Sequence, residues 1–410
     1  MSIIKISPSP LKGEITLPPS KSVTHRALIC AALSGGKCKL SPVDMESQDI
    51  QATMGALETL GAAFHFNGDV LFADGSGMFK SDREQIIDCN ESGSTLRFLL
   101  PLAAAGGVSA RFEGKGRLPE RPLDIFHDIL PLHGVKMSGK TLPLQIDGRL
   151  LPGEYKIPGN VSSQFISGIL MALPILSGES VIKLTSPLES AGYVDMTVDV
   201  MKQFGADVEC RENYYRINSG QNFIPRDFEI ESDWSQAAFF IAANFLGSDV
   251  DIQNLNPDSS QGDKEIANII KNFTANQSDD IVINCAQIPD LVPAIAVCAA
   301  KRPGKTLISG GERLRIKESD RIKAMCDGLK SLGCGVLEKP DGMEIIGSKL
   351  RGGFVNGCND HRIVMAFSVL ASSLNESVTI SDCESVKKSY PNFFKEFRSL
   401  GGLANVIDDR

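Results

Sequence analysis

Long apolar runs are scarce in this chain. The longest, FFIAANFLG and LVPAIAVCAA, reach about ten residues, whereas a membrane-spanning helix needs about 20. The first residues, MSIIKISPSPLKG, contain no apolar segment of the kind that a signal peptide requires. We therefore expect a protein that has no membrane partner and resides in the cytoplasm.

Cysteine pairs with a recognisable spacing are also missing. The ten cysteines form no CxxC motif and no Cys/His set with metal-ligand spacing. Disulfide frameworks are typical of chains shorter than about 100 residues, and this chain has 410. We expect reduced, mostly buried thiols and no metal site. The histidines His25, His65, His127 and His133 show no ligand spacing either and are expected to be surface or core residues.

Basic runs are absent as well, and the formal net charge is −8. Nucleic-acid binders usually carry a basic face, so a nucleic-acid partner is not expected. The chain is 42% hydrophobic and 22% charged, a composition that is ordinary for a globular protein. Its length exceeds what one core usually supports and predicts about two or three domains.

A weak internal repeat organises the chain. A small polar turn followed by an Ala-, Leu- and Ile-rich helix occurs six times, about 70 residues apart with one shorter interval between the fourth and fifth copies. The copies start at Pro19, Glu91, Val161, Ser232, Ile288 and Asn359. Runs typical of strands lie between them, together with further helices that end at glycine in MTVDVMKQFGADVE and RIKAMCDGLKSLGCGV. Three copies on each side of PRDFEIESD predict two similar lobes.

The first turns of these helices carry polar and basic residues. Packing alone explains the small residues in the helix bodies, but it does not explain the polar starts. Helix N-termini offer free N–H groups and a positive dipole end, so several such starts together would bind an anionic ligand. The residues concerned are Lys21, Ser22, Arg26, Ser92, Arg97, Ser162, Ser163, Asp360, His361 and Arg362.

Two charged segments stand out further along the chain. RLRIKESDR could equally well be a solvated helix start. DHRIVMAFSVL leads from charged residues directly into an apolar helix that should be buried. Charge at the mouth of a buried helix more often marks a functional site than a surface.

Nine segments together resemble one known family, the 5-enolpyruvylshikimate-3-phosphate (EPSP) synthases. They occur in the family's order between Lys5 and about Phe397: PPSKSVTHRALICAAL, ESGSTLRFLLPLAA, GRLPERPL, VSSQFISGILMALPIL, SAGYVDMT, IPDLVPAIAV, RIKESDRIKAM, DHRIVMAF and SYPNFF. The resemblance implies an α/β fold of two lobes, each built from three βαβαββ units in an inverse α/β barrel-like arrangement. Residues 20–228 would form the first lobe and residues 1–19 with 229–410 the second, with the active site in the cleft between them.

The resemblance also implies a reaction. Family members transfer the enolpyruvyl group of phosphoenolpyruvate to the 5-hydroxyl of 3-phosphoshikimate through a tetrahedral intermediate and release phosphate. This transferase step belongs to the shikimate pathway, which leads to chorismate and the aromatic amino acids. The family needs no cofactor and no metal, so the implied partners are these two small substrates, and a monomer is expected.

Site residues follow from the same resemblance. The set implied for 3-phosphoshikimate is Lys21, Ser22, Arg26, Ser162, Ser163, Gln164, Ser190, Tyr193, Asp290, Arg313 and Lys317. The set implied for phosphoenolpyruvate is Lys21, Gly93, Arg121, Gln164, Arg321, His361, Arg362 and Lys388. Asp290 resembles the proton acceptor, Glu318 is the second proton-transfer group, and Lys21 completes the catalytic set.

Several of these residues have a simpler alternative role. Asp290 could be the N-cap of the following helix, as Asp233 is expected to be of its own, and Arg97 could brace a turn and is left out of the site. Arg313 stands where some members have an Asn that contacts the sugar phosphate. Gly93 is expected to leave room for the donor and for glyphosate, although it could instead serve a turn with positive φ.

Two other functions remain open. An enolpyruvyl transferase acting on UDP-N-acetylglucosamine would share the fold and the donor, but the reactive cysteine of its mobile loop is missing from GKGRLPERPLD. A non-catalytic anion-binding homologue would not need Lys21, Asp290, Lys317 and Glu318 together. The acid–base set therefore favours the enzyme, and the Ser162–Ser163–Gln164 set favours 3-phosphoshikimate as the acceptor.

Overall fold

The computed structural model describes residues 2–81, 83–276 and 278–407. The chain forms two compact units, the inserted unit (Pro19–Glu231) and the split unit (Met1–Pro18 with Ser232–Arg410). The inserted unit ends after residue 231 rather than at the expected 228. The reason is that Phe228 and Glu229 pair in parallel with Leu40 and Ser41, which ties this segment to the inserted unit.

Three four-stranded sheets in the inserted unit share one pairing scheme. In each sheet the first two strands are parallel and the next two pairs are antiparallel. In spatial order the sheets are β14 (Phe228–Glu229), β3 (Lys37–Ser41), β5 (Val70–Asp74), β4 (Ala63–Asn67); β6 (Gln85–Asp88), β7 (Ala110–Glu113), β9 (Leu144–Gly148), β8 (Val135–Ser138); and β10 (Glu154–Ile157), β11 (Ser180–Leu184), β13 (Tyr214–Ile217), β12 (Glu209–Arg211).

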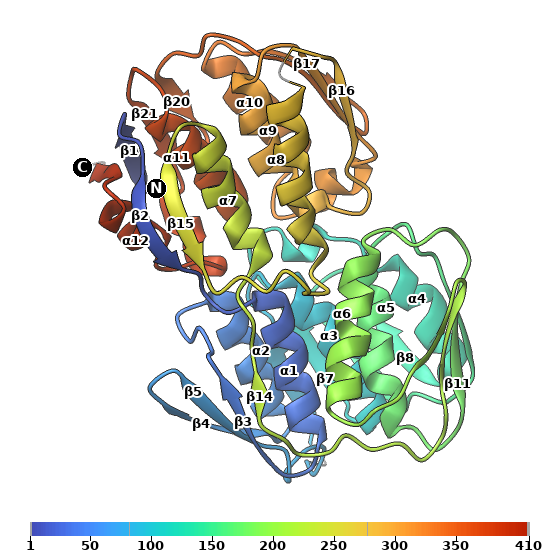
Figure 1. Ribbon diagram of the computed structural model, residues 1–410. Coiled ribbons are helices and arrows are strands. Elements are labelled where there is room, and N and C mark those ends of the chain that lie inside the picture. The colour runs from blue at the N-terminus through green and yellow to red at the C-terminus, as the bar shows by residue number, and fades with distance from the viewer. Residues whose placement is uncertain (1, 82, 277, 408–410) are drawn as a thin grey trace. The chain divides into compact units, whose positions relative to one another are not determined.

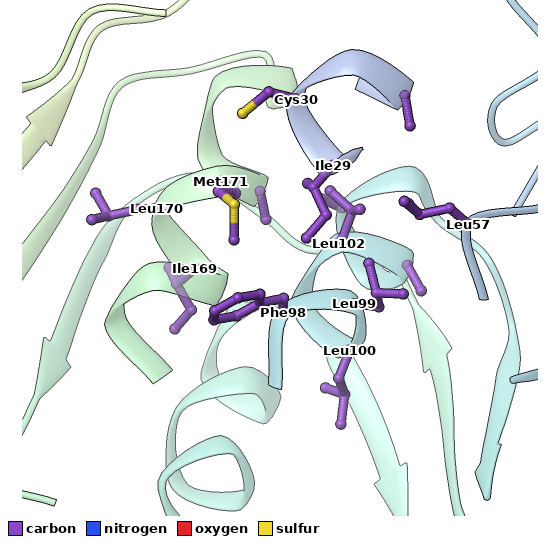
Figure 2. Packing of buried hydrophobic residues seen from close by; sticks show 14 of the residues in the cluster. Ile29, Cys30, Leu57, Phe98, Leu99, Leu100, Leu102, Ile169, Leu170 and Met171 are labelled. Atoms are coloured by element: carbon purple, nitrogen blue, oxygen red, sulfur yellow. The ribbon is translucent and has the colours of Figure 1, made fainter. Parts of the chain in front are cut away.

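The helices of the inserted unit supply much of its buried core. They are α1 (Lys21–Leu33), α2 (Gln48–Thr59), α3 (Gly93–Gly106), α4 (Asp124–Ile129), α5 (Ser163–Ala172) and α6 (Ala191–Gln203), with short 3-10 helices η1 (Leu118–Glu120), η2 (Leu130–His133) and η3 (Leu173–Ile175). Figure 2 shows side chains of α1, α3 and α5 meeting in this core, among them Ile29, Phe98 and Ile169. A side chain at Gly168 of α5 would strike the backbone of Arg97, so the close approach of α3 and α5 requires glycine there.

The split unit has two sheets with the same scheme and a third that departs from it (Figure 1). The first two are β20 (Gly353–Val355), β21 (Val378–Ser381), β1 (Ile3–Ser7), β22 (Leu403–Ile407), and β16 (Ile281–Asn284), β17 (Lys305–Ser309), β19 (Gly342–Ile346), β18 (Gly335–Lys339). The third pairs β2 (Lys12–Thr16) with β15 (Asp249–Gln253). No hairpin completes it within the described residues, because the chain after β15 forms a loop and a helical segment instead.

The helices of the split unit contain the other three repeat copies. They are α7 (Trp234–Phe245), α8 (Ile266–Ala275), α9 (Val292–Lys301), α10 (Arg321–Ser331), α11 (His361–Ser372) and α12 (Phe393–Ser399), with 3-10 helices η4 (Gly262–Glu265), η5 (Pro289–Leu291), η6 (Glu312–Ile316) and η7 (Cys383–Lys388). All six predicted helix starts are confirmed, as α1, α3, α5, α7, α9 and α11. The expected glycine stops are confirmed too, because Gly205 after α6 and Gly333 after α10 have φ of 87° and 88°.

Side-chain caps fix most of these helix starts. Ser20, Ser92, Ser162, Asp233 and Asp360 each accept a hydrogen bond from a backbone N–H of the first turn that follows. The cap role predicted for Asp233 is therefore confirmed. The cap role considered for Asp290 is wrong, because Asp290 lies inside η5 and the residue before α9 is Leu291, which makes no side-chain cap.

The ten cysteines all lie among the described residues and form no disulfide bond there, and most of them are buried. Burial raises the pKa of the Cys30 and Cys89 thiols, which makes their thiolate forms unfavourable. Among the described residues, no helix is both long and apolar enough to cross a bilayer.

Candidate functional site

The predicted site residues fall into two clusters, one in each unit. In the inserted unit, Lys21 opens α1, and its Nζ lies 2.7 Å from Oδ2 of Asp49. Asp49 is the second residue of α2, and sequence reasoning missed it because nothing in the local pattern links it to Lys21. A charge-assisted bond of this kind fixes the direction in which the ammonium points.

Arg26 is buried deeply between α1, α5 and α6. Its Nε donates to Oγ1 of Thr197 at 2.7 Å, its Nη1 to the Ser22 carbonyl at 2.7 Å and its Nη2 to the Tyr193 carbonyl at 2.9 Å. Its guanidinium also lies 5.1 Å from the centre of the Phe98 ring. Burial lowers the pKa of Arg26 to about 10, against the smaller raising effect of Tyr193. Arg26 thus joins two predicted substrate-binding segments through neutral partners.

Gln164 is held at both ends of its amide. Its Oε1 accepts from Nη1 of Arg97 at 2.8 Å, and its Nε2 donates to Oγ of Ser94 at 2.9 Å. Arg97 in turn donates to the Pro122 carbonyl and lies 5.0 Å from the centre of the Phe165 ring. Arg97 therefore orients Gln164, a predicted site residue on another helix, whereas the sequence suggested only that it braces its own turn.

The serines of this cluster are positioned by backbone geometry. Ser162 caps α5 through the backbone N–H of Gln164, and Ser163 is the first residue of the helix. Ser190 precedes α6 with φ of 55° and ψ of 45°, a left-handed conformation that is uncommon for a residue other than glycine. Such conformations persist where the surroundings enforce them, often at functional sites. Tyr193 follows in the first turn of α6.

Gly93 begins α3, and the Arg121 guanidinium lies against it. A Cβ built on Gly93 would come within 2.6 Å of Nη1 of Arg121. Gly93 is a helical residue without positive φ, so the alternative role in a positive-φ turn is wrong. The absence of a side chain at Gly93 is what lets Arg121 occupy this position.

In the split unit, the Arg321 side chain is only 1% exposed and contacts three carboxylates. Its Nη1 lies 2.8 Å from Oδ1 of Asp290, its Nη2 2.7 Å from Oε2 of Glu318 and its Nε 2.8 Å from Oδ2 of Asp360. Burial opposes the charge, but Asp360, Glu318 and Asp290 together raise the pKa of Arg321. Arg321 therefore stays charged and holds the two predicted proton-transfer carboxyls on one guanidinium.

Two further cations, Lys317 and Arg362, contact Asp290. Lys317 Nζ lies 3.8 Å from its Oδ1, and Arg362 reaches its Oδ2 at 3.4 Å and its backbone carbonyl at 3.2 Å. Burial alone would raise the pKa of Asp290, but Arg362, Lys317 and Arg321 hold it well below its usual range, against the opposing charge of Glu318. Asp290 is thus ionised, as a proton acceptor must be, and only weakly basic.

The other predicted residues of the split unit border this cluster. Lys388, the last residue of η7, donates to the Asn359 carbonyl at 2.7 Å, and His361 is buried beside Asp360. Arg313 donates to the Ala286 carbonyl at 2.6 Å, in the loop that follows β16. Within the described part of the chain, no group of three or more His, Cys, Asp or Glu residues is arranged to hold a metal ion.

Comparison with known proteins identifies the family. The model of the EPSP synthase (3-phosphoshikimate 1-carboxyvinyltransferase) family matches residues 6–397. The chain belongs to the EPSP synthase family. The family and the transferase activity predicted from the sequence are confirmed, and the UDP-sugar alternative is not favoured.

Individual EPSP synthases support this assignment. The chain is 42% identical to the 3-phosphoshikimate 1-carboxyvinyltransferase of Clostridium perfringens, over 98% of this chain and 99% of the relative. It is 43% identical to that of Clostridium novyi, over 98% of both chains. The solved EPSP synthase of Acinetobacter baumannii superposes with a TM-score of 0.83 at 26% identity, covering 100% of both chains. The predicted fold class is therefore confirmed.

Proposed function

We propose that the two clusters serve the EPSP synthase reaction with different tasks. The cluster of the split unit would supply Asp290 and Glu318 for proton transfer together with part of the phosphoenolpyruvate site. The cluster of the inserted unit would mainly bind and orient the substrates, with Lys21 as a further proton-transfer group. One observation carries this proposal, namely that Arg321 holds Asp290 and Glu318 on the same guanidinium. An acid–base pair fixed in this way suits a reaction that must both remove and deliver a proton.

The addition step moves one proton from the acceptor and one proton to the donor. Asp290 accepts the proton of the 5-hydroxyl while the oxygen forms a bond to carbon 2 of phosphoenolpyruvate. Glu318 or Lys21 delivers a proton to the methylene carbon, which becomes a methyl group in the tetrahedral intermediate. In the elimination step the bond to the phosphate oxygen breaks, and the group that protonated the methylene takes a proton back from the methyl group, so that the enolpyruvyl double bond forms again. The proton held by Asp290 passes to the departing phosphate.

The low basicity of Asp290 in the free protein fits this sequence of events. Arg362, Lys317 and Arg321 lower its pKa, and a phosphoenolpyruvate anion bound by the same cations would offset their charge. The pKa of Asp290 would then rise towards a value suited to a general base. Donor binding would thus prepare the base for the acceptor hydroxyl.

The remaining site residues would bind the two substrates. The residues that would contact 3-phosphoshikimate are Ser22, Arg26, Ser162, Ser163, Gln164, Ser190, Tyr193, Arg313 and Lys317. Those that would surround phosphoenolpyruvate are Lys21, Gly93, Arg121, Gln164, Arg321, His361, Arg362 and Lys388. Arginine suits the donor side because its planar fork meets carboxylate or phosphate oxygens in pairs.

A phosphate-release assay tests the assignment. Purified protein is mixed with phosphoenolpyruvate and either 3-phosphoshikimate or UDP-N-acetylglucosamine, and a control receives phosphoenolpyruvate alone. We expect phosphate release with 3-phosphoshikimate only. Release with the UDP-sugar alone, or with neither acceptor, would overturn the proposal.

We also propose that the enzyme acts as a monomer in the cytoplasm. The predicted residues of one chain include a candidate for each role in the reaction, and the expected substrates are small soluble anions. Light scattering of the active protein tests the first part, and fractionation of cells that express it tests the second. Activity confined to a dimer or to the membrane fraction would contradict this proposal.

A further inference from the structure

A buried carboxyl lies beside the acid–base cluster of the split unit without a role in the proposed reaction. Asp263 belongs to η4, in the helical segment that follows β15, and it is 3% exposed. Burying a carboxyl is unfavourable unless its neighbours compensate. The burial of Asp263 therefore implies that neighbouring groups stabilise its carboxyl.

The segment around Asp263 is fixed to the start of α7. Gln261 accepts from the backbone N–H of Trp234 at 3.0 Å and donates to the Ser232 carbonyl at 2.9 Å. Ser235, the second residue of α7, donates its Oγ–H to Oδ2 of Asp263. These contacts leave Asp263 little freedom to move away from the cluster.

Helix α7 contacts η4, which contains Asp263, and also η5 and α11, which contain Asp290 and Arg362. Asp290 in η5 and Asp233 at the start of α7 repel the negative charge of Asp263, while Arg362 in α11 attracts it. Burial, the strongest influence, and the charge of Asp290 raise the pKa of Asp263 to about 6, although Arg362 and the Ser235 hydroxyl work in the opposite direction. Asp263 can therefore change its charge close to neutral pH.

The electrostatic effect between two groups is mutual. Because the charge of Asp290 disfavours ionisation of Asp263, an ionised Asp263 makes Asp290 a stronger proton acceptor by the same coupling. Arg362 contacts Asp290 directly, and the charge of Asp263 also offsets part of the Arg362 charge. The two carboxyls and this guanidinium thus form one coupled group.

We propose that Asp263 is a positioning residue for this reaction, whose carboxylate, anchored by Ser235, acts through the electric field on Asp290 and Arg362 and strengthens Asp290 as the base. This inference rests on the function proposed above. In the proposed reaction Asp263 itself contacts no reacting atom. It supplies a negative charge that partly balances the cations around Asp290.

The Asp263→Asn variant tests this role through the pH dependence of turnover. At about pH 8 we expect kcat to be about 5-fold below wild type and KM for phosphoenolpyruvate to be lower, because one negative charge is gone. At about pH 5 Asp263 of the wild type is mostly protonated, so the ratio of the two kcat values should approach one. Using the ratio removes the titration of the substrate phosphates, which is common to both proteins.

Two further variants make the test specific. Asp258→Asn removes the same charge from an exposed position in the same loop and should leave kcat unchanged at both pH values. Ser235→Ala removes a hydrogen bond that lowers the pKa of Asp263, so its activity should fall at a higher pH than that of the wild type. This second variant keeps the test decisive if Asp263→Asn folds poorly.

The outcomes separate cleanly. Equal losses at both pH values would indicate a structural role and overturn the inference, as would wild-type kinetics in both Asp263→Asn and Ser235→Ala. A pH-dependent ratio together with a shifted profile in Ser235→Ala would support it. If the wild type releases no phosphate from phosphoenolpyruvate and 3-phosphoshikimate, the proposed function fails instead.

Discussion

The two clusters hold their cations in different ways. In the inserted unit, Arg26 and Arg97 donate mainly to hydroxyl, carbonyl and amide oxygens, and the Lys21–Asp49 contact is the ionic exception among the pairs described above. In the split unit, Arg321 and Arg362 face carboxylates directly. Neutral partners orient a cation and leave its charge available to an anion, whereas carboxylate partners largely compensate that charge.

The two kinds of partner suit different steps of the reaction, anion binding and proton transfer. A charge that its neighbours leave uncompensated favours binding of phosphate and carboxylate groups. Coupled cations and carboxylates instead shift each other's pKa values, which is what proton transfer requires. Removal of Asp290 or Glu318 in the split unit should therefore lower kcat most, and substitutions in the inserted unit other than at Lys21 should mainly change KM.

The largest effect is expected for the acid–base pair. Asp290→Asn and Glu318→Gln should each lower kcat by about 100-fold or more, because each removes a proton-transfer group. Steady-state phosphate release measures this, with circular dichroism to show that the fold survives. Glu312→Gln, an exposed position in η6, is the matched control and should behave like wild type. Near-normal turnover in either variant would remove that residue from the mechanism.

The second effect concerns stability and pH. The pKa of Asp263 is raised to about 6 in the folded protein, above the value of about 4 expected when it is unfolded. Ionised Asp263 therefore destabilises the fold above about pH 6, and the penalty disappears below about pH 4. Asp263→Asn should stabilise the protein by on the order of 2 kcal/mol at about pH 7.5 and by nothing at about pH 4.

Urea unfolding at several pH values measures this gain, with Asp258→Asn as the exposed control. The opposite result, a variant less stable than wild type at neutral pH, would contradict this prediction. It would show that the contacts of the Asp263 carboxylate with Ser235 and Arg362 stabilise the folded protein by more than the burial of its charge destabilises it. The expected combination, higher stability with lower turnover, would distinguish a functional charge from a structural one.

The third effect tests the donor side of the inserted unit. Gly93→Ala should displace the Arg121 guanidinium, because its Cβ would lie 2.6 Å from Nη1. We expect the wild type to be glyphosate-sensitive, and the variant to be about 10-fold less so, because glyphosate is longer than phosphoenolpyruvate and tolerates the loss of space less well. Use of phosphoenolpyruvate should be reduced but retained.

Inhibition curves and thermal melts of Gly93→Ala measure both parts of this prediction. The control is Gly55→Ala in α2, where a Cβ has no neighbour within 4 Å. Because Gly93 is helical, its alanine variant should keep the wild-type melting temperature. Equal weakening of inhibitor and substrate together with a lower melting temperature would contradict the pocket assignment.

The smallest effect is expected for Arg97→Lys. Lysine keeps the charge but cannot hold Gln164 and the Pro122 carbonyl with one planar fork. Gln164 should lose its fixed orientation, so that KM for both substrates rises by about 3-fold while kcat changes little. Arg117→Lys, a partly exposed position, is the control. A fall in kcat at unchanged KM would place Arg97 with the catalytic residues.

The helix starts and the residue types of the proposed site could be predicted from the amino-acid sequence. Periodicity and capping residues depend on neighbours a few positions away, so the six repeat copies and the cap at Asp233 could be predicted locally. The resemblance then supplied the family and the acid–base residues. Neither the local pattern nor the resemblance predicted which side chains of distant segments contact each other.

Which charged groups face each other follows from packing between distant segments. Arg26 and Thr197 are 171 positions apart, and Arg321 and Asp360 are 39 apart, so no local pattern links them. Asp263 has no unusual neighbours in the sequence, and burial between η4 and α7 is what shifts its pKa. Burial and the direction of each charged side chain depend on packing between distant segments, and these set the electrostatics of the site.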